Sequence, residues 1–256
     1  GIREKTDVLV TAPVEAANYF KKLPEPVEKA KADLKKAWLE NLQDLNVAGQ
    51  RGLIEHFDST AGAATVLLPL GGKYQATPAE GMAAKLPVLS GDTKTVSLMS
   101  YGYNPKLAKW SPYHGALYAV VEAVTKIVAM GGNYENIRLS LQEYFEKLEK
   151  KPEKWGKPFT ALLGAYYAQK ALQIPAIGGK DSMSGTFDDL HVPPTLVAFA
   201  VNVAEAEHVL SPEFKKTGSY VVWIPLKRDQ SELPDFEQMK KNFKKIFELA
   251  KEGKVL

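Results

Sequence analysis

The sequence predicts an α+β fold in which helices pack on one face of a mixed β-sheet. Segments with helical and strand patterns alternate irregularly along the 256 residues, and neighbouring strands are joined both by helices and by turns. The longest apolar run, PPTLVAFAVNVA at residues 193–204, predicts a central strand that is buried on both faces or nearly so. A chain of this length can bury one large core or two small ones.

The first fifty residues predict a helical arm or linker. In residues 24–42, apolar side chains recur every three or four positions among charges, which indicates one amphipathic helix. Residues 44–57 predict a short helix, and residues 58–75 predict a turn and a short apolar strand that ends at Pro69. We therefore expect an arm over 1–51, a domain over 52–226, and a helix over 227–256 that leads into a further domain.

The middle of the chain predicts a strand at 94–103, a loop at 104–111 and a long helix at 112–130. Ser111 and Pro112 are typical of a helix start, and Gly131 is typical of a helix end. One face of this helix is apolar. The other carries Glu122 and Lys126 among small residues, which implies that another surface lies close to it.

The sequence from residue 136 onward predicts three more strands and two helices. Residues 136–141 indicate a strand, 142–156 a polar insertion, and 157–173 a helix that leads into a buried strand at 174–179. Residues 219–226, SYVVWIPL, indicate a strand, and 235–252 a helix that Gly253 ends. The chain closes with KVL and has no initiator methionine, so we expect it to be a piece of a longer polypeptide, with a natural terminus from which a tag was trimmed as the alternative.

The composition argues against several classes of function. The formal net charge is only +3, with 33 basic and 30 acidic residues interspersed, so nucleic acid and anionic membrane surfaces are not expected partners. No apolar run approaches the roughly 18 residues of a spanning helix, and the start lacks a signal peptide's apolar segment. The expected location is the cytoplasm.

Cysteine is absent, which excludes a disulfide framework, a thiolate zinc site and a cysteine nucleophile within these residues. The four histidines are scattered, and none belongs to a metal-binding HExxH pair. Any metal ion would therefore depend on carboxylates.

The stretch IPAIGGKDSMSG combines paired glycines with a lysine, an aspartate and serines. It is not a P-loop, because Ile174 stands where that motif needs glycine and Asp181 where it needs serine or threonine. Two interpretations stay open. Backbone N–H groups with Lys180 and Ser182 can form an anion site, or the segment is a tight turn with a solvated lysine.

Two glutamates are further candidates. Glu80 lies in a loop of small residues, AEGMA, which leaves room for a ligand or metal ion, although a lone loop glutamate is usually solvated. Glu122 lies four residues before Lys126, and such a pair on a helix is usually a solvent-exposed ion pair.

These motifs together resemble one family. GGKDSMS, AEGMA, VVEAVTKIVAMGG and FDSTAGAATVLLP are similar to the second nucleotide-binding half of phosphoribosylformylglycinamidine synthase, an enzyme of purine biosynthesis. The resemblance covers residues 52–226. It implies the fold of the N-terminal domain of the aminoimidazole ribonucleotide synthetase (PurM-like) superfamily, in which two such domains pair their sheets.

The resemblance also implies site residues. Glu80 and Glu122 correspond to acids that bind Mg²⁺ beside ATP or ADP, and the backbone at Ala79 would touch that nucleotide. Lys126 replaces an asparagine ligand, and its charge can stand in for one cation near phosphates. Arg51 lies near a family lysine that contacts the nucleotide.

The GGKDSMS turn would contribute Gly179, Lys180 and Ser182 to phosphate or substrate binding, where this half meets the other half of the enzyme. Related proteins have two nucleotide sites, one catalytic and one structural, and this half contributes to both. No catalytic residue is assigned to this chain, because the family's catalytic histidine belongs to the first half and the cysteine of the glutaminase domain is absent here.

The resemblance thus implies a fragment of an ATP- and glutamine-dependent carbon–nitrogen ligase, inactive alone. Its expected partners are the first PurM-like half, the following C-terminal domain and the glutaminase domain, and in their absence a second copy in a homodimer. One alternative is a non-catalytic scaffold whose nucleotide is structural or lost. Another is a separate kinase-like enzyme of the superfamily, for which only Asp58 and Glu80 offer acids near the start of the fold.

Overall fold

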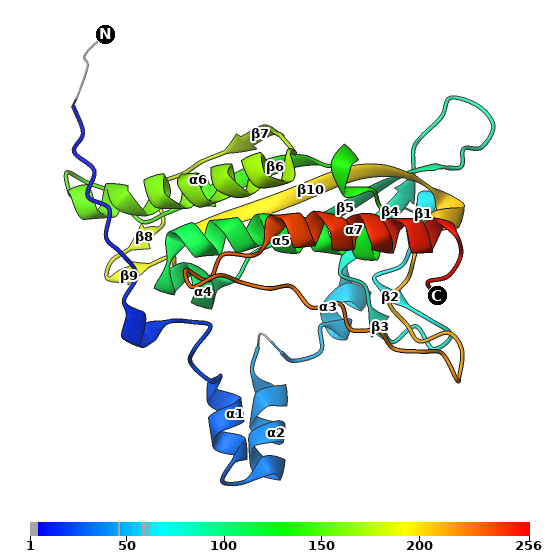
Figure 1. The fold of residues 1–256 in the computed structure, drawn as a ribbon, viewed down its shortest axis with the longest axis horizontal. Helices are drawn as coiled ribbons and strands as arrows, with labels where there is room; N and C mark the ends of the chain where they lie inside the picture. The colour runs from blue at the N-terminus through cyan, green and yellow to red at the C-terminus, as the bar shows by residue number, and fades with distance from the viewer. Residues whose placement is uncertain (1–4, 46, 58–59, 61) are drawn as a thin grey trace.

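A six-stranded mixed sheet forms the centre of the molecule in a computed structural model, which describes residues 5–45, 47–57, 60 and 62–256 (Figure 1). Every pair of neighbouring strands is antiparallel except the last, which is parallel and is joined by a helical crossover. The predicted α+β class with a mixed sheet is confirmed. In sheet order, the strands are β1 (Thr65–Leu67), β4 (Gly81–Lys85), β5 (Thr95–Gly102), β10 (Thr195–Glu205), β6 (Arg138–Tyr144) and β7 (Ala176–Lys180).

Short elements connect these strands. The two-stranded ribbons are β2 (Leu70–Gly71) with β3 (Thr77–Pro78), and β8 (Thr186–Phe187) with β9 (Leu190–His191). Single turns of 3₁₀ helix are η1 (Glu15–Ala17), η2 (Gly62–Ala64), η3 (Tyr134–Asn136) and η4 (Ala206–His208). The β2–β3 ribbon leads directly into β4, so it positions the loop that carries Glu80.

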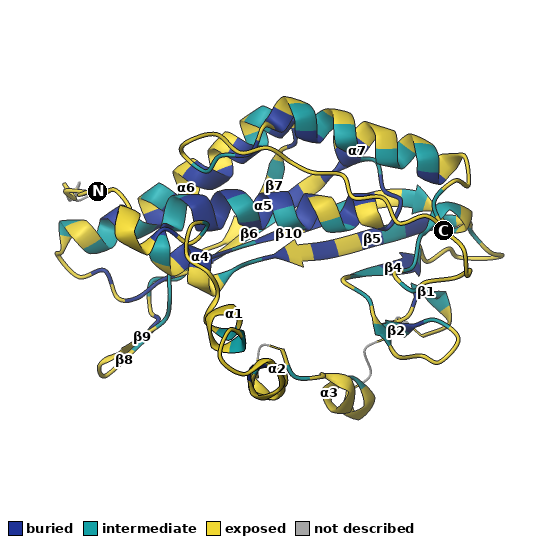
Figure 2. Cartoon of the chain, turned by 60° about the horizontal axis from the view of Figure 1, so that its bottom comes forward, coloured by how far each residue is buried: buried dark blue, intermediate teal, exposed yellow. Residues whose placement is uncertain are grey.

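Helices α5 (Pro112–Ala129) and α6 (Pro152–Leu172) cover one face of the sheet, and α7 (Phe236–Lys251) packs against both (Figure 2). The side chain of Ser111 accepts a hydrogen bond from the His114 N–H and caps α5, as predicted. No helix of the described residues is long and apolar enough to cross a membrane.

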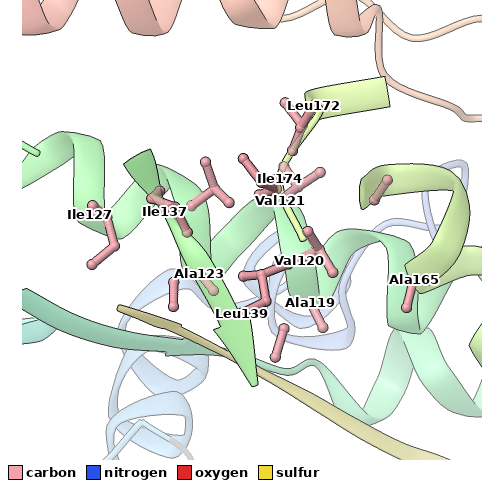
Figure 3. Packing of buried hydrophobic residues seen from close by; sticks show 14 of the residues in the cluster. Ala119, Val120, Val121, Ala123, Ile127, Ile137, Leu139, Ala165, Leu172 and Ile174 are labelled. Carbon is pink, nitrogen blue, oxygen red and sulfur yellow. The ribbon is translucent and has the colours of Figure 1, made fainter. Parts of the chain in front are cut away.

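The main hydrophobic core lies between these helices and the sheet. Figure 3 shows aliphatic side chains of α5, β6 and α6 in contact, among them Val120, Leu139 and Ala165. Ile174 follows α6 and is also buried in this core. Burial of this one face is what holds α5 at a fixed height above β5 and β10.

The other face of the sheet is open. Met99 and Tyr101 on β5, and Phe199 and Val203 on β10, are exposed, although buried residues alternate with exposed ones along both strands. Figure 2 shows this alternation along β5. The prediction that residues 193–204 are buried on both faces is therefore wrong. One face of this apolar run packs against the helices. The other face is also apolar, and none of the described residues covers it.

The arm contains three short helices, α1 (Glu25–Ala30), α2 (Leu34–Gln43) and α3 (Arg51–His56), and α1 and α2 pack on each other away from the sheet (Figure 1). The single helix predicted for residues 24–42 is thus two helices. Asp33 causes the break, because its side chain accepts the Lys36 N–H and caps α2. Ahead of α1, the Leu9 N–H donates to the Pro152 carbonyl and ties the arm to α6.

Two segments contain more regular structure than their sequences indicate. The loop predicted at 104–111 contains α4 (Pro105–Trp110), which begins because the Asn104 side chain accepts the Leu107 N–H and Pro105 follows it. The polar insertion predicted at 142–156 contains the end of β6, the start of α6 and the buried ring of Phe145.

Two strand predictions are corrected. The segment at 174–179 was expected to be a buried strand, but β7 is an exposed edge strand and only Ile174, ahead of it, is buried. Residues 219–226 form no strand, because no segment that the structure describes pairs with their main chain in a sheet, and Tyr220 and Trp223 are almost fully exposed. The helix predicted at 235–252 is confirmed as α7. The predicted domain boundaries at 51 and 226 stay predictions.

Candidate functional site

The two glutamates singled out from the sequence lie together, with a lysine between them. The Lys126 Nζ lies 2.9 Å from Glu80 Oε2 and 2.8 Å from Glu122 Oε1. The Lys126 side chain is only 14% exposed, whereas Glu80 is largely exposed. Segments far apart in the sequence therefore meet at one ammonium group.

Local structure explains why these side chains meet. Glu122 and Lys126 are one turn apart on α5, where side chains four residues apart lie on the same face. The pairing of β4 with β5 begins at Gly81 opposite Ser100, so the edge of β5 beyond Ser100 has no β4 neighbour. Lys126 lies over this free edge, with its Nζ 4.7 Å from the centre of the Tyr101 ring.

The end of β5 holds Glu122 as well. The second carboxylate oxygen of Glu122 accepts a hydrogen bond of 3.1 Å from the Tyr103 N–H. Gly102 lies directly under α5, where a Cβ atom would come within 2.2 Å of the Ala119 carbonyl oxygen and 2.8 Å of the Glu122 Cβ. The helix therefore approaches β5 closely enough for the carboxylate to reach the strand's main chain.

The cluster is built for a charged lysine. Burial disfavours the charge, but hydrogen bonds to Glu122 and Glu80 outweigh it and raise the pKa of Lys126 above its ordinary value. Two carboxylates and one ammonium leave the cluster with one net negative charge. Lys126 is thus the internal counter-ion of both glutamates.

A divalent cation does not fit this arrangement as it stands. Mg²⁺ takes oxygen ligands at about 2.0–2.1 Å in near-octahedral geometry. The space between Glu80 and Glu122 is filled by the ammonium, and no group of three or more His, Cys, Asp or Glu side chains suited to a metal ion occurs among the described residues. Asp58 lies outside them. No magnesium-dependent step is derived from these residues.

The Lys180 turn lies at the same end of the sheet but apart from the cluster. Gly102, Ala198, Leu141 and Gly179 are successive partners across four strands. Three strand spacings of about 4.8 Å separate Gly179 from Gly102 by about 14 Å. The expected residues therefore occupy one rim of the sheet without forming a single contact cluster.

The GGKDSMS segment is a structured extension of the edge strand. Gly179 passes close to β6, where a Cβ atom would come within 2.2 Å of the Leu141 carbonyl oxygen. The Ser182 N–H donates to the Glu143 carbonyl, and the Ser182 hydroxyl bonds the Ser184 hydroxyl. Lys180 is exposed at the end of β7. The Lys180 side chain therefore lies beside a hydrogen-bonded segment at the rim of the sheet.

Glu143 was not among the residues predicted from the sequence. This carboxyl group is buried, its Oε1 has no hydrogen-bond partner among the described residues, and burial, with a smaller contribution from the charge of Asp181, raises its pKa to about 7. The sequence could have indicated this position, because Leu139, Leu141 and Glu143 are alternate residues of β6 and therefore lie on the same, covered face of the strand.

The two remaining candidates lie on either side of the β2–β3 ribbon. The Ala79 N–H donates to the Pro69 carbonyl, so only its carbonyl group is free to meet a ligand. Arg51, at the start of α3, is exposed and pairs with Glu55 at 2.6 Å. Arg51 also lines a hollow of about 440 Å³ with Pro69 and Gln75.

Sequence comparison finds that this chain is similar to subunits of one enzyme. It is 23% identical over 225 residues to "Phosphoribosylformylglycinamidine synthase subunit PurL" of Thermococcus sibiricus, covering 85% of this chain and 28% of that protein. PurL of Pyrobaculum aerophilum is 26% identical over 206 residues, covering 78% of this chain and 26% of that protein. This chain is a homologue of PurL. It spans about a quarter of the length of these relatives, and no family model matches it.

Solved structures show the same fold. PurL of Thermotoga maritima complexed with AMPPCP superposes with a TM-score of 0.63 at 17% identity, covering 97% of this chain and 35% of that one. The same PurL complexed with FGAR gives a TM-score of 0.58 at 19% identity, over 80% of this chain and 30% of that one. The PurM-like fold implied by the resemblance is confirmed.

Proposed function

We propose that this chain is a nucleotide-binding part of a phosphoribosylformylglycinamidine synthase, the ligase that converts formylglycinamide ribonucleotide to formylglycinamidine ribonucleotide. The observation that carries the proposal is the similarity to PurL subunits in sequence and in fold, together with the exposed Lys180 turn at the rim of the sheet. Solved PurL structures hold ATP, AMPPCP or ADP, which supports a nucleotide ligand.

The rim of the sheet would supply the contacts. Backbone groups at Ala79 and Gly179, with the side chains of Lys180 and Ser182, would hold the nucleotide or substrate phosphates, and Arg51 would lie at the margin of the site. Lys180 is a point charge suited to phosphate, and backbone N–H groups are the usual second element of such a site. Magnesium would reach this part of the enzyme on the phosphates themselves, because Lys126 fills the space between the two glutamates.

The chemistry of the whole enzyme would be phosphoryl transfer from ATP to the substrate's amide oxygen, followed by attack of ammonia. Ammonia would come from glutamine in a glutaminase domain elsewhere, since the sequence contains no cysteine to act as nucleophile. The role of the present residues is to bind and orient phosphates. The isolated chain is therefore expected to show no turnover.

The open face of the sheet suits the expected partners. Exposed apolar residues on β5 and β10 would pack against the sheet of the first PurM-like half, and residues 219–226 would contact the following domain. Without those partners, the open face is expected to join two copies of the chain. The cytoplasm stays the expected location.

A scaffold role is the second candidate. The observation that favours it is the Lys126 ammonium, which neutralises one of the two acids that would otherwise attract a metal–nucleotide complex. In that case the domain would support the active half without exchanging a ligand.

Calorimetric titration with ADP distinguishes the two candidates. We expect the wild type to bind ADP, Lys180→Ala and Ser182→Ala to bind about tenfold more weakly for each lost charged or polar contact, and Lys170→Ala, a control at an exposed lysine of α6, to bind like the wild type. Mass detection of nucleotide released from denatured protein tests for a tightly held ligand. Absence of binding by all variants would favour the scaffold, and turnover of ATP, substrate and ammonia by this chain alone would contradict the fragment role.

A further inference from the structure

The Lys126 ammonium lies between two carboxylates, at the position where a cation is needed. This cation is a side chain of the protein itself. We propose that Lys126 is the permanent cation of this site and that the Glu80–Glu122 pair binds no divalent metal ion. This inference deepens the proposed function of the site, but it concerns the metal alone.

The geometry of the cluster is that of an ammonium group. The carboxylate oxygens lie 2.8 and 2.9 Å from the Lys126 Nζ, which are ordinary lengths for a charge-assisted N–H···O bond. A magnesium ion in the same place would need each oxygen about 0.8 Å closer and further oxygen ligands around it. The spacing between the Glu80 and Glu122 carboxylates therefore matches a bridging ammonium nitrogen and not a bridging magnesium ion.

Three features keep the ammonium in place. Its side chain is largely buried between α5 and the edge of β5, the Tyr101 ring lies beneath it, and both glutamates accept its hydrogen bonds. Lys126 also lies in the last turn of α5, where the unpaired carbonyl groups of a helix end favour positive charge. A metal ion would have to displace an ammonium group that both carboxylates already bind.

Lys126 also links separate segments of the chain, as a bound metal ion could. It links the loop before β4 to α5 through Glu80, and Glu122 continues the link to the main chain of β5 at Tyr103. The loop is thus held closed without any ion from solution. Chelators are expected to leave this part of the protein unchanged.

Manganese binding, followed by electron paramagnetic resonance, tests the proposal on the purified full chain without nucleotide. We expect the wild type to show no Mn²⁺ site that depends on Glu80 or Glu122. Lys126→Asn removes the charge and adds an oxygen ligand, so it is expected to gain one Mn²⁺ site, which the double variant Lys126→Asn/Glu122→Gln loses. Lys85→Asn, at an ion pair with Asp92 on the other end of β4, is the matched control and gains no such site.

Two results would overturn the proposal. One is Mn²⁺ binding by the wild type that Glu80→Gln or Glu122→Gln abolishes, a measurement that does not need the lysine variant to fold. The other is a folded Lys126→Asn, verified by circular dichroism, that binds no Mn²⁺, since the lysine would then not be what excludes the metal. Neither measurement involves ADP or turnover, so the ADP titration and the turnover assay test the proposed function independently of this one.

Discussion

Gly102 on β5 lies so close beneath Ala119 on α5 that a Cβ atom on the glycine would come within 2.2 Å of the Ala119 carbonyl oxygen. The contact brings Glu122, the next residue but two on the helix, to the end of the strand, where it accepts the Tyr103 N–H. The distance of α5 from the sheet and the position of Glu80 and Glu122 therefore both depend on residue 102 being a glycine.

Gly102→Ala is expected to destabilise the protein by about 1–3 kcal/mol, because the added methyl group must push α5 off the sheet. Urea unfolding followed by circular dichroism measures the change. The control is Gly178→Ala on β7, where nothing lies within 4 Å of the added atom, and it is expected to change the free energy of unfolding by less than about 0.5 kcal/mol. Equal effects of the two substitutions would contradict the close approach of α5.

Lys126→Met is expected to destabilise the protein by about 1–2 kcal/mol in buffer without divalent ions, since two carboxylates are left facing each other without a counter-ion. Thermal unfolding compares it with Lys94→Met, which removes an exposed lysine 3.9 Å from Glu207 and is expected to have little effect. A Lys126→Met protein as stable as the wild type would show that the cluster contributes nothing to the fold.

Glu143 is expected to make stability depend on pH. Its folded pKa of about 7 lies above the ordinary value of 4.5, so the folded state binds the extra proton. The free energy of unfolding should fall as pH rises from about 4.5 to 7 and then level off, by at most about 3 kcal/mol.

Glu143→Gln keeps the shape of the side chain and removes the ionisable group. We expect this variant to be more stable than the wild type at pH 8 and similar to it at pH 5, as measured by urea unfolding at both values. Glu153→Gln, at an exposed glutamate of α6, should follow the wild type. A difference between wild type and Glu143→Gln that does not change with pH would contradict the assignment.

The open face of the sheet is expected to drive self-association. Phe199→Lys places a charge in the middle of that face and should convert dimers to monomers in sedimentation velocity, whereas Leu89→Lys, at an exposed apolar position in the loop between β4 and β5, should not. A wild-type protein that sediments as a monomer at high concentration would rule out this association.

Local signals in the sequence predicted α5. Ser111, Pro112 and Gly131 bound this helix because capping is decided within a few residues, and the spacing of Glu122 and Lys126 placed both on one face of it. Two other local signals, the helix caps at Asp33 and Asn104, were overlooked. The remaining predictions failed where neighbouring segments decide the outcome. Residues 219–226 have strand composition, but a strand needs a second chain segment to pair with, and the run at 193–204 does not reveal that one of its faces is uncovered.

The candidate site was predictable in part. The pairing of Glu122 with Lys126 followed from helix geometry, whereas the meeting of Glu80 with both depended on where β4 begins, which only the sheet register shows. The distance between this cluster and the Lys180 turn is likewise a property of strand order. Glu143 was overlooked because a charged residue at an inward position contradicts the usual distribution of polar side chains.

The unpaired segment at 219–226 has a practical consequence. Chymotrypsin cuts after large aromatic residues in extended, accessible chain, and Tyr220 and Trp223 meet both conditions. Phe236, Met239 and Phe243 anchor α7 in the core, so the severed helix would remain attached by its contacts alone. Protein nicked in this segment would elute as one particle in native chromatography and separate into its fragments in denaturant.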